Sequence, residues 1–90
     1  MEKLVSALEE VLIYLRNSES SDYTHMSVDE IITKLEHELA KVNNSKSVDF
    51  KLLSSLFTPT GAIQETAIDN DWGKEYLRIS AVIDQYIETH

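Results

Sequence analysis

Residues 56–73, which read LFTPTGAIQETAIDNDWG, decide how this chain folds. They hold the only proline, both glycines and the only tryptophan among the 90 residues. Pro59 disfavours helical geometry at the residue before it, so we expect a helix to end near Phe57. Gly61 supplies either backbone freedom or room for a close contact with a neighbouring helix. The chain therefore turns a corner within this stretch.

Two helical segments are expected after the proline. Thr60 is placed to cap a short segment with apolar side chains at positions 63, 67 and 68. The last helix is predicted to begin at Asn70 or Asp71, because either residue suits an N-cap. Its apolar stripe has helical spacing and consists of Trp72, Tyr76, Ile79, Ile83 and Tyr86.

Three further helices are predicted before the corner. Apolar residues within 2–17 recur at intervals of three and four, as they do on one helix face. A second helix begins after Ser27, whose hydroxyl can accept from the Glu30 amide while the Glu30 carboxylate reaches back to the Ser27 amide. That helix is predicted to stop near residues 43–44. The third is predicted to start with Ser47 as its N-cap and Asp49 in its first turn.

These segments predict an all-α fold with a single helical domain spanning residues 1–90. The chain has a length typical of one domain, and 42% of its residues are hydrophobic, which is enough for a core. No alternating apolar run bounded by turn residues indicates a strand. Short loops place consecutive helices side by side, so we expect a compact antiparallel bundle of about four helices, with a short bent helical piece before the last.

Charge and composition restrict the class of partner. The chain has no run of about 18 apolar residues to span a membrane, and its N-terminus does not resemble a secretory signal, so we expect a cytoplasmic protein. A net charge of −8 repels nucleic-acid phosphate and anionic lipid, and it attracts a basic protein. The same charge also keeps a small protein soluble without any partner.

Motifs for metal binding and catalysis fail at the residues that they require. His37 and Glu38 begin like a metalloprotease helix, but Lys41 stands where the second histidine is needed. Residues 69–73 begin like a calcium loop, but glycine, lysine and serine occupy its fifth, sixth and twelfth positions. Carboxylate pairs such as Glu36 and Glu38 are interpreted as solvated surface. We therefore predict a protein that is not an enzyme, with no catalytic residue, metal or cofactor.

Acidic and aromatic residues are the candidates for binding a protein partner. Trp72 and Tyr76 fit a core stripe, but tryptophan and tyrosine are also frequent interface anchors, and both interpretations stay open. One acidic cluster, near the turn, contains Glu65, Asp69, Asp71 and Glu75, and a second contains Glu19, Asp22, Asp29 and Glu30. For any single residue of either cluster, helix capping and solubility are the favoured explanation. The candidate partner-binding residues are Asp69, Asp71, Glu75, Glu65, Trp72, Tyr76, Tyr23 and Asp22.

The runs LFTPTGAIQE at 56–65, IDN at 68–70 and WGKEYL at 72–77 resemble a segment of small, mostly uncharacterised bacterial proteins. Some of these are similar to immunity proteins of contact-dependent inhibition and other polymorphic toxin systems. The resemblance covers residues 56–77 only. It implies a stoichiometric inhibitor of a toxin domain, often a nuclease, that binds by charge and shape and has no catalytic residues.

The expected function is therefore that of an immunity-type protein whose acidic surface neutralises a basic toxin domain. The alternative is a small non-enzymatic structural or regulatory helical module, for which a homodimer is one arrangement. Acidity, small size and the lack of a catalytic motif fit both.

Overall fold

The computed structural model describes residues 2–20, 26–58 and 61–89, and it is all-α over these ranges. The predicted fold class is confirmed. The described residues form five helices and no strand, with a radius of gyration of 12.1 Å for the chain. The helices are α1 (Glu2–Arg16), α2 (Val28–Ser45), α3 (Phe50–Leu56), α4 (Ala62–Asp69) and α5 (Gly73–Thr89).

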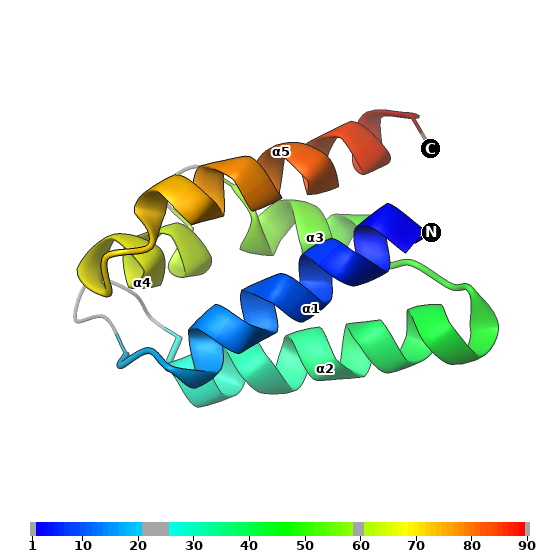
Figure 1. Ribbon diagram of the computed structural model, residues 1–90. Helices are drawn as coiled ribbons and strands as arrows, with labels where there is room; N and C mark the ends of the chain where they lie inside the picture. The colour runs from blue at the N-terminus through cyan, green and yellow to red at the C-terminus, as the bar shows by residue number, and fades with distance from the viewer. Residues whose placement is uncertain (1, 21–25, 59–60, 90) are drawn as a thin grey trace.

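The central element is α1, which packs against α2 on one side and α5 on the other (Figure 1). It runs antiparallel to both of these long helices. The short helices α3 and α4 contribute apolar side chains to the same core, and α4 lies at the end of the molecule opposite the two termini. The bent piece expected before the last helix is therefore a helix of its own with 8 residues, and α3 has 7.

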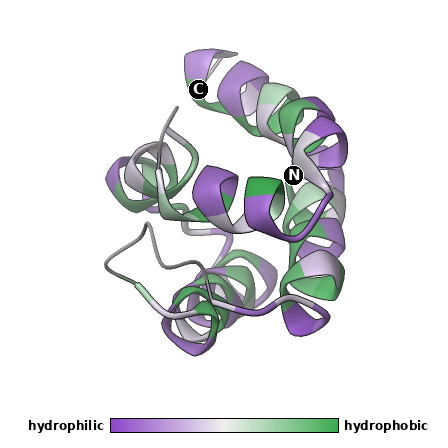
Figure 2. Cartoon of the chain, turned by 90° about the vertical axis from the view of Figure 1, so that its left-hand side faces the viewer, coloured by the Kyte–Doolittle hydropathy of each residue, from purple (hydrophilic) through white to green (hydrophobic). Residues whose placement is uncertain are grey.

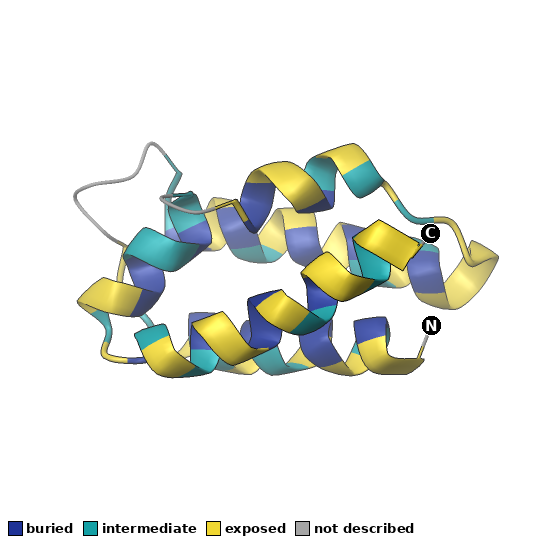
Figure 3. Ribbon diagram, turned by 90° about the horizontal axis from the view of Figure 1, so that it is seen from above, coloured by how far each residue is buried: buried dark blue, intermediate teal, exposed yellow. Residues whose placement is uncertain are grey.

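Apolar faces at helical spacing form the core. On α1, Leu4, Leu8, Val11 and Leu15 are fully buried, and the apolar stripes of α2 and α5 meet them. Viewed along the helices, the apolar residues turn toward the centre of the molecule (Figure 2). Buried segments accordingly alternate with exposed ones along each long helix (Figure 3). No helix within the described ranges combines the length and apolarity needed to cross a bilayer.

The helix boundaries before the corner follow local capping, with three corrections. Ser27 accepts a hydrogen bond from the Glu30 amide at 3.2 Å, as predicted, but the Glu30 carboxylate accepts from the Ser27 hydroxyl at 3.4 Å and not from its amide. The N-cap of α3 is Asp49, which accepts from the Leu52 amide at 3.0 Å; Ser47 lies too early. Lys46 ends α2 in a left-handed conformation with φ 55°, slightly later than predicted.

Glycine is needed at position 61 because the backbone passes close to Thr58, and not because the position needs an unusual backbone conformation. Its φ is −77°, which any residue adopts. An added Cβ would lie 2.9 Å from both the carbonyl oxygen and the methyl carbon of Thr58, so the chain could not fold back so tightly after α3. Gly61 is also the N-cap of α4 and makes no side-chain cap. Pro59 and the predicted cap Thr60 lie outside the described residues.

The last helix begins later than predicted. Asn70 ends α4 instead of starting α5, and Asp71 takes a left-handed conformation with φ 66° in the turn between them. The first residue of α5 is Gly73.

Candidate functional site

Trp72 fixes the corner between α4 and α5 to the rest of the molecule. It is only 4% exposed, and its ring stacks on that of Tyr14 with 5.0 Å between centroids. Its Nε1 donates to the Ser18 hydroxyl at 2.9 Å, and its backbone amide donates to the Ala67 carbonyl at 2.9 Å. Through its side chain, Trp72 therefore connects the start of α5 to the end of α1. Through its backbone amide it connects the start of α5 to α4.

Burial decides the question that the sequence left open about the aromatic residues. Tyr76 is 2% exposed and stacks on Phe57, with the rings nearly parallel and 6.2 Å between centroids. It also meets the Trp72 ring edge-on. Both Trp72 and Tyr76 are core residues in this structure, so their side chains do not reach a surface partner.

Asn70 ties the α1–α2 connection to the same corner. Its side-chain amide donates to the Thr66 carbonyl at 2.8 Å and to the Glu19 carbonyl at 2.9 Å. Its Oδ1 accepts from the Glu19 amide at 2.9 Å. One residue further, the Ser20 hydroxyl accepts from the Val28 amide at 2.9 Å, which links this segment to the start of α2. Glu19, from the second predicted acidic cluster, is thus brought beside the first.

The predicted acidic cluster is divided by the fold. Glu65 and Asp69 are one turn apart on α4, where Asp69 is exposed and Glu65 half-buried, and Asp71 is exposed in the turn that follows. Glu75 lies elsewhere, on the side of α5 that faces α1. The hydrogen bond that Arg78 donates to Glu10 is the main cause that raises the pKa of Arg78, and the charge of Glu75 adds to it. The candidates Asp22 and Tyr23 lie outside the described residues.

Two exposed apolar side chains lie next to these acids. Ile68 is 52% exposed and Leu77 is 61% exposed. A Cβ added to Gly73 would lie 3.6 Å from Cγ1 of Ile68, and Leu77 follows Gly73 by one turn on α5. Ile68 and Leu77 therefore flank Gly73. We call the surface of Glu65, Ile68, Asp69, Asp71, Gly73 and Leu77 the corner surface.

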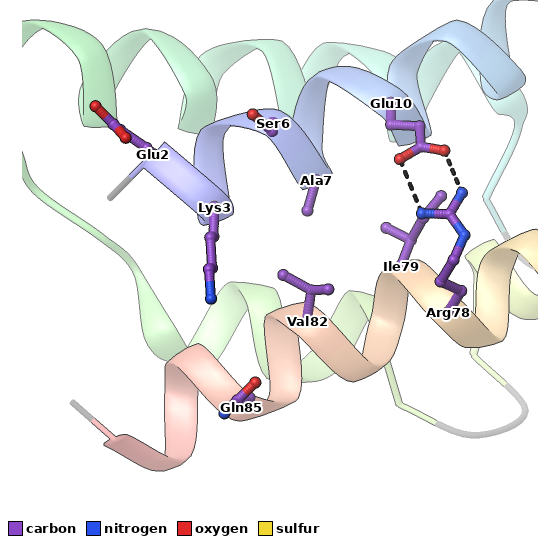
Figure 4. Close-up of a pocket in the computed structure, with 9 residues that line it drawn as sticks. All are labelled: Glu2, Lys3, Ser6, Ala7, Glu10, Arg78, Ile79, Val82 and Gln85. Atoms are coloured by element: carbon purple, nitrogen blue, oxygen red, sulfur yellow. Dashed lines mark hydrogen bonds and ion pairs between the residues drawn. The ribbon is translucent and has the colours of Figure 1, made fainter.

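A groove of about 490 Å³ runs between α1 and α5 (Figure 4). Ala7, Ile79 and Val82 form its apolar lining, and the ion pair of Glu10 with Arg78 stands at one end. The hydrogen bond from Arg78 lowers the pKa of Glu10, so this carboxylate stays charged at neutral pH. Sequence patterns did not indicate this groove, because it depends on how two helices from opposite ends of the chain pack.

Glu38 is not the solvated surface residue that the sequence suggested. Its side chain is fully buried, and Oε1 accepts from the Asp49 amide at 2.6 Å. Lys41 approaches the other oxygen at 3.5 Å. Its spacing contained a signal, because Glu38 lies three residues after Leu35 and four before Val42, on the buried face of α2. Its role is structural: it holds the start of α3 against α2.

Comparisons of the chain with models of protein families, with curated proteins and with solved structures found no match. Over the part of the chain that the structure describes, no three His, Cys, Asp or Glu side chains come together to hold a metal ion. The corner surface joins two exposed acids, Asp69 and Asp71, and the half-buried Glu65 to two exposed apolar side chains, and it is our candidate site.

Proposed function

We propose that this chain is an immunity-type protein that binds and neutralises a basic toxin domain through the acidic corner between α4 and α5. The observation that carries this proposal is the charge of a rigidly held corner. Residues 61–73 contain three acidic residues and no lysine or arginine, within a chain of net charge −8. The buried Trp72 and the hydrogen bonds of Asn70 hold this segment in place before any partner arrives.

Charge and rigidity give such a protein a way to inhibit a nuclease-like toxin. A domain that acts on nucleic acid needs a positive surface for the phosphates. An acidic protein is steered to that surface by long-range attraction and covers it without any chemistry of its own. A rigid corner loses little conformational entropy when it binds, which favours a tight complex. The proposed site of action is the cytoplasm, where the inhibitor meets a delivered toxin.

The test is capture of the tagged protein from its native cells, at low and then high salt, with the co-purified proteins identified by mass spectrometry. We expect one basic protein in stoichiometric amount that dissociates as salt rises. Its isolated domain should stop growth when expressed alone and be harmless when expressed with this chain. A captured partner that is harmless alone would contradict the immunity function. Recovery of the chain only as a homodimer would favour a structural or regulatory module.

A further inference from the structure

Three large apolar side chains are more than half exposed within the described residues: Ile13, Ile68 and Leu77. Ile13 stands by itself on the outer face of α1, and single exposed apolar residues are common on protein surfaces. Ile68 and Leu77 differ because they come from two helices and flank the same glycine. Ile68 packs over Gly73, and Leu77 follows one turn later on α5, so the two side chains stand near each other on the surface.

Leu77 is not a misplaced core residue. The core face of α5 is formed by Tyr76, Ile79 and Ile83, and Val82 lines the groove toward α1. Leu77 projects away from that groove, on the same face of α5 as Gly73. The pair is also bordered by charge, since Asp69 directly follows Ile68 and Glu65 precedes it by one turn on α4.

We infer that Ile68 and Leu77 form the apolar centre of the binding surface, and that its occupant is a basic protein segment with one apolar side chain between lysines or arginines. This inference rests on the proposed function and adds the chemistry of the partner. The apolar side chain would pack on Ile68 and Leu77, while the flanking cations meet Glu65, Asp69 and Asp71. An apolar centre with a charged rim is the usual anatomy of a specific protein interface.

Charge complementarity distinguishes this occupant from a second copy of the chain. In a symmetric dimer through this face, each copy would present the same surface to the other. Asp69 and Asp71 of one copy would then lie near the same carboxylates of its mate, and like charges brought together oppose association. A basic segment meets the same acids with attraction.

The experiment is an NMR titration of the ¹⁵N-labelled protein with two synthetic peptides. One is a short run of lysines with a central leucine, and the other has serine in place of that leucine. Each is titrated into the natural chain, into Leu77→Glu and into Ile13→Glu. Ile13→Glu is the matched control, because Ile13 is 58% exposed against 61% for Leu77 and both substitutions add one negative charge. Unchanged amide shifts of buried residues verify that each variant is folded.

We expect the leucine peptide to move the amide signals of Ile68, Gly73 and Leu77, and to bind more tightly than the serine peptide. Leu77→Glu should weaken its binding about tenfold, the effect of losing one buried leucine contact, although the added charge alone would strengthen it. Ile13→Glu should leave the affinity within about twofold of the natural chain, since a remote surface charge contributes little.

Equal binding of the two peptides, with shifts at Glu65, Asp69 and Asp71 alone, would overturn the apolar centre and leave the acidic corner in place. No shift at the corner surface with either peptide would contradict both this inference and the proposed function. Signals of Ile68 and Leu77 that move with protein concentration in the absence of peptide would show a second copy on this face and overturn the inference.

Discussion

At the scale of single residues, the least satisfied group is the hydroxyl of Tyr76. It is buried and has no hydrogen-bond partner among the described residues. Tyr76→Phe removes the hydroxyl and keeps the stacking on Phe57. Because a buried unpaired polar group costs about 1–3 kcal/mol, we expect the variant to raise the free energy of unfolding by about 1 kcal/mol, measured by urea titration. A loss of stability would mean that the hydroxyl has a partner in solution.

The same hydroxyl predicts a loss of stability in alkali. Burial, with a smaller effect from the charge of Asp84, raises the pKa of Tyr76 from 10.0 to about 12. The unfolded chain therefore releases this proton more readily than the folded one. This group does not change the stability with pH below pH 10, and it lowers the stability as the pH rises from 10 toward 12. Thermal melts across this range should show a steeper decline for the natural chain than for Tyr76→Phe. Equal declines would contradict the assignment.

Glu38 and Glu36 look alike in the sequence and differ in the fold. Glu38→Ala leaves the Asp49 amide without its buried acceptor and removes the partner of Lys41. We expect a loss of about 2–4 kcal/mol in unfolding free energy, with a smaller loss for Glu38→Gln, which keeps an acceptor. The matched control is Glu36→Ala, whose ion pair with Arg16 is about half exposed on both sides and is worth about 1 kcal/mol or less. Equal losses for both alanine variants would contradict this account.

At the scale of the helices, boundaries set by neighbouring residues could be predicted and those set by distant ones could not. The start of α2 follows from Ser27 and Glu30, which interact across three positions. The start of α5 was predicted wrongly because Asn70 is a reasonable N-cap by itself. Its side chain instead binds the backbone of Glu19, 51 positions away. No local pattern contains that pairing.

The candidate site, too, could be predicted only where it depends on residues that are close in the sequence. The acids Glu65, Asp69 and Asp71 were identified from charge and position alone. Glu75 lies outside the corner surface because of its angular position on α5. The exposure of Leu77 depends on which side of α5 meets α1. Trp72 and Tyr76 could be assigned to the core only after the packing was known.

Asn70 is expected to control the connection between α1 and α2. Asn70→Asp removes the two side-chain donors to Thr66 and Glu19 and places a carboxylate against their carbonyls. We expect a loss of about 1–3 kcal/mol, together with faster hydrogen exchange at the amide of Glu19. The control is Asn43→Asp, an exposed position on α2 with the same change of charge. Unchanged exchange at Glu19 would show that the corner does not hold this connection.

At the scale of the whole molecule, the net charge is −8, and we expect the acids of the corner surface to matter most for binding. The termini lie at one end and the corner surface at the other (Figure 1). Glu65 and Asp69 stand on α4 at the corner end, whereas Glu2 and Glu88 are exposed near the termini. Changing either pair to lysine alters the net charge by the same amount. Asp71 is left unchanged because its left-handed backbone would strain most replacements.

The most direct test of the central claim is the association rate of these two double variants with the captured partner, measured by stopped flow at low salt. We expect Glu65→Lys with Asp69→Lys to slow association about tenfold or more, because steering depends on charge near the docking surface. Glu2→Lys with Glu88→Lys should slow it far less. If both pairs slow association equally, the net charge of the molecule governs binding, and the corner between α4 and α5 is not the binding surface.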